Sequence, residues 1–143
     1  DIPVVGGKAP NFTLKGLDGE IHQLSDFEGQ AILLNFWGTF CPPCVAETPL
    51  LQEYYEKYKE EGFIILGINL NESNVTAQGF VRQFGVTYPI LMDKDQVRRQ
   101  YGVNQFPTTL FIQPDGTIAE IWIGEIKEPQ LKPRIERLLA AKG

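Results

Sequence analysis

The chain contains two cysteines, Cys41 and Cys44, with two prolines between them. An apolar run over residues 31–37 precedes the pair, and a helical pattern begins at Pro43. A Cys-x-x-Cys pair between a strand and a helix indicates redox chemistry, because the two sulfurs can form a disulfide. Cys41 falls where the helix begins, and there the unpaired N–H groups and the positive end of the helix dipole favour a thiolate. The pair therefore predicts a site of thiol–disulfide exchange.

Two other uses of a cysteine pair fit less well. A disulfide at this spacing closes a very small loop, so it removes little entropy from the unfolded chain and is a poor structural staple. A structural zinc ion needs four ligands, whereas the chain offers two cysteines and one histidine, His22. We expect no metal, and no cofactor beyond the Cys41–Cys44 disulfide.

The positions of the two thiols predict their roles. Cys41, at the start of the helix, is expected to attack a partner disulfide, and Cys44, one turn further in, to resolve the mixed disulfide. Pro42 and Pro43 have no N–H, so the first backbone donor that can reach the Cys41 sulfur is that of Cys44. No histidine or lysine within the pair adds positive charge. We therefore expect a modest depression of the Cys41 pKa and a reducing protein.

Length and composition predict a soluble globular protein with one domain, residues 1–143, and we expect it to be a monomer. Of the 143 residues, 43% are apolar and 22% charged, which is ordinary for a globular protein with a substantial core. The net charge of −5 argues against nucleic acid or an anionic membrane surface as partner. No stretch approaches the roughly 18 apolar residues of a membrane helix. Because the chain starts at Asp1 without a methionine, we expect a mature or trimmed chain.

Hydrophobic periodicity predicts the elements around the pair. Alternating residues at 12–14 and 21–24 flank Asp18-Gly19 and indicate a β-hairpin, and Ser25 with Glu28 predicts a capped helical turn. Two apolar runs, 31–37 and 63–70, are expected to be buried parallel strands joined by a helix from Pro43 to about residue 58.

The pattern further along continues the alternation of helices and strands. It predicts a helix over 75–84, capped by Ser73 or Asn74, with Val81 and Phe84 inward. A strand over 86–92, a helix over 97–101 and strands over 108–112 and 118–123 are expected to follow. The last helix is expected to end at Gly143 and to have an apolar face made of Leu131, Ile135, Leu138 and Leu139. This order predicts an α/β fold: a mixed central sheet flanked by helices, with the cysteine pair outside the carboxyl end of a central strand.

Several segments resemble the thioredoxin superfamily. Residues 36–44 (FWGTFCPPC) resemble its active-site motif, and Phe106-Pro107-Thr108 resembles its cis-proline loop. Residues 9–14 (APNFTL), 24–29 (LSDFEG) and 35–37 (NFW) are similar to the extracytoplasmic TlpA/ResA branch. The resemblance implies a thioredoxin-like fold with an N-terminal β-hairpin and a central helix–strand insertion at about residues 71–92.

The same resemblance implies a function and a location. Members of this branch reduce disulfides in partner proteins outside the cytoplasm, and several act on apocytochromes c in cytochrome c maturation. Their electrons come from a membrane thiol carrier, and an N-terminal anchor commonly tethers them. Other members serve spore-envelope formation or act as general reductants.

The resemblance also bears on the proton acceptor for Cys44. Thioredoxin has a buried aspartate six residues before the first cysteine, whereas this chain has Asn35, which cannot accept a proton. Glu47 lies three residues after Cys44, hence on the same side of the helix, and ResA-type proteins carry a functional glutamate at this spacing. Partial burial and a nearby thiolate would raise the pKa of Glu47.

Further residues are expected to contact the partner protein. The family match places Phe106 and Pro107 against an extended substrate strand. The remaining expected substrate-binding residues flank the cysteines: Trp37, Phe40, Pro42 and Pro43.

Three alternatives remain at this point. A peroxiredoxin-like peroxidase shares the fold, but it needs a proline and a threonine or serine at set positions upstream; Thr39 is only two residues before Cys41, and no proline precedes it in that loop. A strong oxidase would be expected to have a histidine between the cysteines. A binding or chaperone module with an idle cysteine pair would fail to reduce insulin.

Overall fold

The computed structural model describes residues 2–141; Asp1, Lys142 and Gly143, the expected ends of the domain and of the last helix, lie outside the described residues. Across residues 2–141, seven strands form one mixed sheet in the order β2-β1-β5-β4-β3-β6-β7. The strands are β1 (Thr13–Gly16), β2 (Ile21–Gln23), β3 (Ala31–Trp37), β4 (Phe63–Leu70), β5 (Ile90–Asp93), β6 (Thr108–Ile112) and β7 (Ile118–Ile123). The helices within the described residues are α1 (Pro42–Tyr58), α2 (Asn74–Phe84), α3 (Gln96–Gln100) and α4 (Glu128–Ala140), with short 3₁₀ turns η1 (Leu24–Phe27) and η2 (Lys59–Glu61).

The centre of the sheet is the parallel pair β3 and β4. All seven residues of β3 are buried, as a continuous apolar run predicts for a strand covered on both faces. Strand β6 pairs with the other side of β3 in antiparallel orientation. Strand β3 leads directly toward α1, so the cysteine pair lies at the carboxyl end of a central strand.

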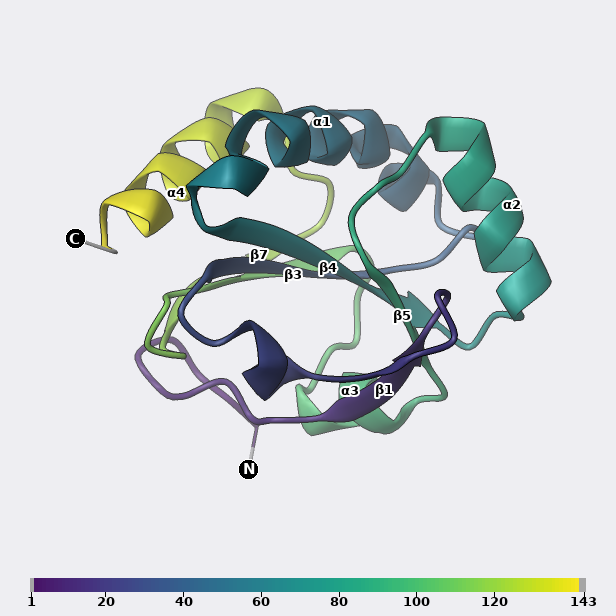
Figure 1. Ribbon diagram of the computed structural model, residues 1–143, viewed down its shortest axis with the longest axis horizontal. Helices are drawn as coiled ribbons and strands as arrows, with labels where there is room; N and C mark the ends of the chain where they lie inside the picture. Colours follow the sequence, from purple (N-terminus) through teal and green to yellow (C-terminus); the bar gives the residue numbers. More distant parts are fainter. Residues whose placement is uncertain (1, 142–143) are drawn as a thin grey trace.

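Helices cover both faces of this sheet. Figure 1 shows α1, α2 and α4 on one face and α3 on the other, with β1 near α3. The buried apolar side chains accordingly form two clusters, one under α1, α2 and α4 and one toward α3 and η1. Within residues 2–141, no helix has both the length and the apolar character that crossing a bilayer requires.

The N-terminal hairpin is confirmed, but the capping of its following turn is not as predicted. The turn η1 begins at Leu24. The carboxylate of Asp26, not that of Glu28, accepts the hydrogen bond that closes it, from the Gln23 N–H at 2.8 Å. Leu24 is buried, and its N–H bonds to the Phe12 carbonyl, so the start of the turn follows the burial of this leucine and not the position of Ser25.

Around α2 the predicted cap and inward residues are confirmed, whereas the following strand needs correction. Ser73 caps α2, and Val81 and Phe84 pack, half-buried, against the core. Ala77 and Phe80 are buried more completely. The expected strand over 86–92 is shorter, because β5 begins only after Pro89, which has no N–H to give to the sheet.

Candidate active site

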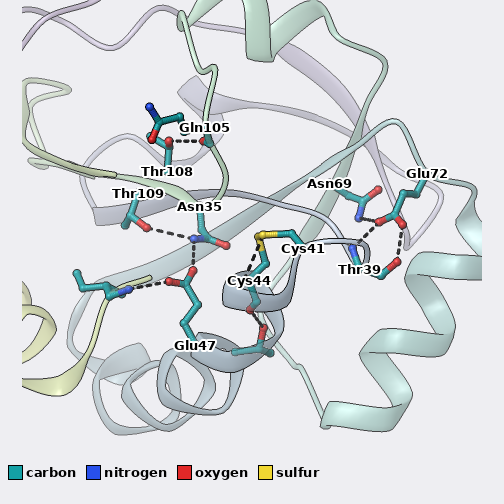
Figure 2. Close-up of a disulfide and its surroundings, with 12 residues drawn as sticks. Asn35, Thr39, Cys41, Cys44, Glu47, Asn69, Glu72, Gln105, Thr108 and Thr109 are labelled. Atoms are coloured by element: carbon teal, nitrogen blue, oxygen red, sulfur yellow. Dashed lines mark hydrogen bonds between the residues drawn. A yellow bond between two sulfur atoms is a disulfide. The ribbon is translucent and has the colours of Figure 1, made fainter. Parts of the chain in front are cut away.

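Cys41 and Cys44 form a disulfide at the first turn of α1, with their Cα atoms 5.2 Å apart. Cys41 is the residue that caps the helix, and Pro42 and Pro43 occupy its first positions. The Cys41 sulfur accepts a hydrogen bond from the Cys44 N–H at 3.3 Å, which confirms the donor predicted from the two prolines (Figure 2). Cys41 is 6% exposed and Cys44 1%, so an incoming group reaches Cys41 first.

The loop before the pair is tightly folded. The Cys41 N–H donates to the carbonyl of Gly38. A Cβ at Gly38 would lie 2.1 Å from the Phe40 ring, so only glycine lets that ring fold back over the loop. The segment 38–41, here called the redox loop, therefore carries Cys41 from the end of β3 to the start of α1.

Glu47 lies in α1, one turn beyond Cys44, and is buried more completely than predicted. Its side chain is 1% exposed, and its two oxygens accept hydrogen bonds from the Asn35 amide at 2.8 Å and from the Ile126 N–H at 3.0 Å. Loss of hydration raises the pKa of Glu47 to about 7, although these two hydrogen bonds oppose the rise. A carboxyl group with a pKa near neutrality can both accept and return a proton.

Asn35 orients this carboxyl group. Its amide nitrogen also donates to the Thr109 hydroxyl at 3.1 Å, so β3 and β6 together hold the donor aimed at Glu47 (Figure 2). The sequence singled out Asn35 through the resemblance, as the residue at the position of thioredoxin's buried aspartate. It gave no signal for Ile126, because the contact uses a backbone N–H that every residue but proline has.

The expected partner-binding residues divide into exposed and buried ones. Phe40 is 58% exposed, and its ring meets that of Phe106 edge-to-face at 6.2 Å. The Phe106–Pro107 peptide bond is cis, as the resemblance implied. Trp37, in contrast, is 4% exposed and packs on Phe80 of α2, so it belongs to the core and offers almost no surface to a partner.

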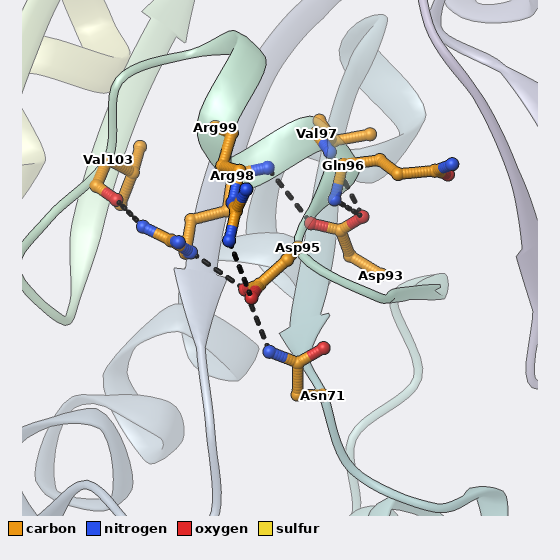
Figure 3. A network of polar contacts seen from close by, with 8 residues as sticks. All are labelled: Asn71, Asp93, Asp95, Gln96, Val97, Arg98, Arg99 and Val103. Carbon is orange, nitrogen blue, oxygen red and sulfur yellow. Dashed lines mark hydrogen bonds and ion pairs between the residues drawn. The ribbon is translucent and has the colours of Figure 1, made fainter.

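A groove of about 340 Å³ lies beside the aromatic pair Phe40 and Phe106. Its polar wall is a network in which Asp95 accepts hydrogen bonds from Asn71 at 2.7 Å and from Arg98 at 2.9 Å (Figure 3). Arg98 also lowers the pKa of Asp95. The groove thus joins an apolar edge to a wall whose Asp95 and Arg98 charges are paired with each other.

The sequence did not reveal Glu72, just after β4. Its carboxylate accepts hydrogen bonds from the Thr39 N–H, the Thr39 hydroxyl and the Asn69 amide. This contact joins the redox loop to the segment before α2. No motif marks it, because it depends on two loops 33 residues apart meeting in space.

The sequence matches the AhpC/TSA family over residues 5–121. The thiol-disulfide oxidoreductase ResA of Geobacillus thermodenitrificans (strain NG80-2) is 39% identical over 135 residues, which cover 94% of this chain and 78% of that protein. ResA of Halalkalibacterium halodurans is 40% identical over 132 residues, covering 92% of this chain and 75% of that protein. The chain belongs to the AhpC/TSA family, in the ResA-like branch of the thioredoxin superfamily.

The fold of this ResA-like protein agrees with a solved structure. A Chlorobium tepidum protein assigned as the thiol:disulfide interchange protein DsbE superposes with a TM-score of 0.88 at 31% identity, over 100% of both chains. The expected α/β thioredoxin-like fold is therefore confirmed. With the Cys41–Cys44 disulfide at the start of α1, the ResA-like protein is a thiol–disulfide oxidoreductase.

Proposed function

We propose that this oxidoreductase reduces disulfide bonds of partner proteins outside the cytoplasm. Cys41 attacks the partner, Cys44 resolves the mixed disulfide, and Glu47 takes the Cys44 proton. The observation that carries the proposal is the Glu47 carboxyl group, buried one turn beyond Cys44 with a pKa of about 7. A group of this kind supplies what Asn35 cannot, a proton acceptor inside the site.

The reaction balances in two exchange steps. The Cys41 thiolate attacks one partner sulfur, the partner S–S bond breaks, and the other partner sulfur leaves as a thiolate. Cys44 then gives its proton to Glu47 and attacks the Cys41 sulfur. The Cys41–Cys44 disulfide forms, the mixed disulfide breaks, and the second partner thiolate leaves. The partner gains two electrons, and the enzyme is left oxidised.

The environment of Cys41 favours reduction over oxidation. One backbone N–H, that of Cys44, bonds to its sulfur, and the two residues between the cysteines carry no charge. Strong oxidants owe their high potential to a reduced form that is unusually stabilised. A thiolate with a single hydrogen-bond donor receives little of that stabilisation, so the dithiol gives up its electrons readily.

The partner is proposed to dock against the exposed aromatic pair, Phe40 and Phe106, beside Pro107. Exposed aromatic rings next to a redox pair suit an extended polypeptide segment that carries a disulfide. Following the resemblance to the TlpA/ResA branch, we include apocytochrome c as the partner, a membrane thiol carrier as the electron donor and an N-terminal tether in the proposal. Apart from the thiols of that carrier and of the partner, the proposed cycle needs no redox group beyond the Cys41–Cys44 disulfide.

Peroxidase chemistry is the less favoured alternative. Thr39 provides the nearest hydroxyl group before Cys41 in the sequence, and it donates its hydrogen bond to Glu72. A peroxide would have to displace that bond. Consumption of hydrogen peroxide by the reduced protein at a rate comparable to its reduction of insulin would favour the peroxidase instead.

Insulin reduction with single-cysteine variants tests the proposal. Cys44→Ser is expected to stop turnover and accumulate a mixed disulfide through Cys41, whereas Cys41→Ser is expected to form none. Val75→Ala, at an exposed position of α2, is the matched control and should keep full activity. A reduction potential of about −270 mV supports a reductase, and one of about −120 mV contradicts the proposal.

A further inference from the structure

A second buried asparagine, Asn69, lies on the strand that pairs with that of Asn35 and on the same face of the sheet. Asn69, in β4, is the register partner of Trp37 in β3 and is wholly buried. Its amide nitrogen donates to Glu72 at 2.9 Å. The two central strands thus each carry, near their carboxyl ends, an asparagine that holds a glutamate: Asn35 holds Glu47, and Asn69 holds Glu72 (Figure 2).

Glu72 uses both of its oxygens to hold the redox loop. One oxygen accepts the Thr39 N–H at 2.9 Å, and the other accepts the Thr39 hydroxyl at 2.5 Å. Thr39 lies two residues before Cys41. The backbone that delivers Cys41 is therefore fastened to a side chain that is itself fixed to the buried end of β4.

This fastening becomes important once the disulfide is open. In the oxidised protein the bond to Cys44 restrains Cys41 directly. In the dithiol that bond is absent. The place of the Cys41 sulfur then depends on how the Cys41 backbone is held, on one side by the Val45 N–H of α1 and on the other by the redox loop. A misplacement of about 1 Å in a reacting group costs on the order of 100-fold in rate.

We propose that Glu72 is a positioning residue for thiol–disulfide exchange, which holds Thr39 so that the Cys41 thiolate keeps its place at the start of α1. The inference rests on the proposed function, because it assigns Glu72 a part in the same reaction. Glu72 acts through Thr39 and takes no proton or electron itself.

Glutamine and alanine at this position separate geometry from charge. In Glu72→Gln the amide oxygen can accept from both the Thr39 N–H and Asn69, while the amide nitrogen donates to the Thr39 hydroxyl, which can also accept. The fastening survives and the charge is lost. In Glu72→Ala both are lost. Glu60→Ala, in η2 at the far end of α1, removes one exposed carboxylate and serves as the charge control.

The test measures the reduced proteins in three ways. These are the rate of mixed-disulfide formation with insulin, the pH profile of Cys41 alkylation, and the potential of the couple against glutathione. Glu72→Ala is expected to form the mixed disulfide at least about tenfold more slowly than the parent protein. It should also change the alkylation profile and the potential, because it removes the hydrogen bonds that join the redox loop to the Glu72 carboxylate. Glu72→Gln and Glu60→Ala should stay within about twofold of the parent rate.

Each outcome decides the matter. Equal rates for Glu72→Ala and the parent protein, or equally low rates for Glu72→Ala and Glu72→Gln, would overturn the inference. If the parent protein fails to reduce insulin, the proposed function fails, and the alkylation profile and potential still decide the role of Glu72. If Glu72→Ala does not fold, Thr39→Val replaces it: a threefold or larger loss of rate supports the inference, and an unchanged rate overturns it.

Discussion

At Glu47, burial and hydrogen bonding act on the pKa in opposite directions. Removal from water favours the protonated form, while the donors from Asn35 and Ile126 favour the carboxylate. Burial prevails, and the pKa is left at about 7. The two hydrogen-bond donors carry no full positive charge, so they lower the pKa of Glu47 only in part. The pKa stays near neutrality, where a carboxyl group can both accept and release a proton.

Replacement of this carboxyl group should therefore slow the resolving step. Glu47→Gln is expected to lower the rate at which Cys44 resolves a preformed mixed disulfide by about 100-fold at pH 8, the low end of what a positioned general base contributes. Stopped-flow release of the second partner thiol measures it. Attack by Cys41 should change little, so an equal loss in both steps would contradict the assigned role.

Glu47 should also make stability depend on pH. Its pKa is 4.5 ordinarily and about 7 in the folded protein, so between these values the folded state holds a proton that the unfolded state has lost. The stabilisation is complete below about pH 4.5 and is lost as the pH rises through about 7. Relative to Glu47→Gln, the parent protein is expected to gain about 3 kcal/mol in unfolding free energy from pH 8 to pH 4.

Urea unfolding of both proteins at a series of pH values measures this difference. Titration of other groups cancels in the comparison, because the two proteins share them. A constant difference across the range would show that Glu47 titrates normally in the folded state.

The sequence predicted the reacting residues of the site better than the residues that hold them in place. The cysteine spacing, the two prolines and the position of Glu47 follow from the order of residues along one strand and one helix. Glu72 was missed because its contact with Thr39 depends on how two loops 33 residues apart meet, and no motif marks Asn69, which bonds to it. Trp37 was expected to face a partner, and its burial under Phe80 depends on where α2 packs.

At the scale of elements, α2 covers the end of β3 and shields the Trp37 side chain from solvent. The Phe80 ring lies 4.7 Å from that of Trp37, centroid to centroid. Gly67 in β4 makes room for the indole, since a Cβ there would lie 3.0 Å from its ring nitrogen. The α2 helix is therefore part of the wall on which the redox loop rests.

Truncation of Phe80 should destabilise the protein through this wall. Phe80→Ala is expected to cost about 3–5 kcal/mol in unfolding free energy, as the loss of a buried aromatic side chain does. Val75→Ala in the same helix, at a position 84% exposed, should change it by less than about 0.5 kcal/mol. Urea titration followed by tryptophan fluorescence compares the two, and similar midpoints would contradict the packing role of α2.

The strands were predictable where burial on both faces dictates the residue types. Strands β3 and β4 coincide with the predicted runs for this reason. The start of β5 was not predictable, because Val86 and Tyr88 are buried although they precede the strand. These two residues are therefore buried without pairing in the sheet, and Pro89, which has no N–H to donate, precedes the first paired residue.

At the scale of the whole molecule, redox state and stability are linked. The Cys41–Cys44 disulfide constrains the unfolded chain by about 2 kcal/mol for so short a loop. The dithiol gains no comparable stabilisation from the single N–H at the Cys41 sulfur. We therefore expect the oxidised protein to be more stable than the reduced one by about 1–2 kcal/mol.

Urea unfolding with and without excess dithiothreitol gives the two stabilities. Proteins that introduce disulfides show the opposite order, because their reduced form is stabilised. A more stable reduced form would therefore count against the reductive direction proposed above.

The hydrogen bond from the Ile126 N–H to Glu47 joins two parts of the chain 79 residues apart, α1 and the connection between β7 and α4. An amide proton that donates to a carboxyl oxygen changes its magnetic shielding when that carboxyl ionises. The Ile126 cross-peak in a nitrogen–proton correlation spectrum should therefore move with pH about a midpoint near 7. It would report the charge of Glu47 with no substrate present, and Glu47→Gln should leave the peak still.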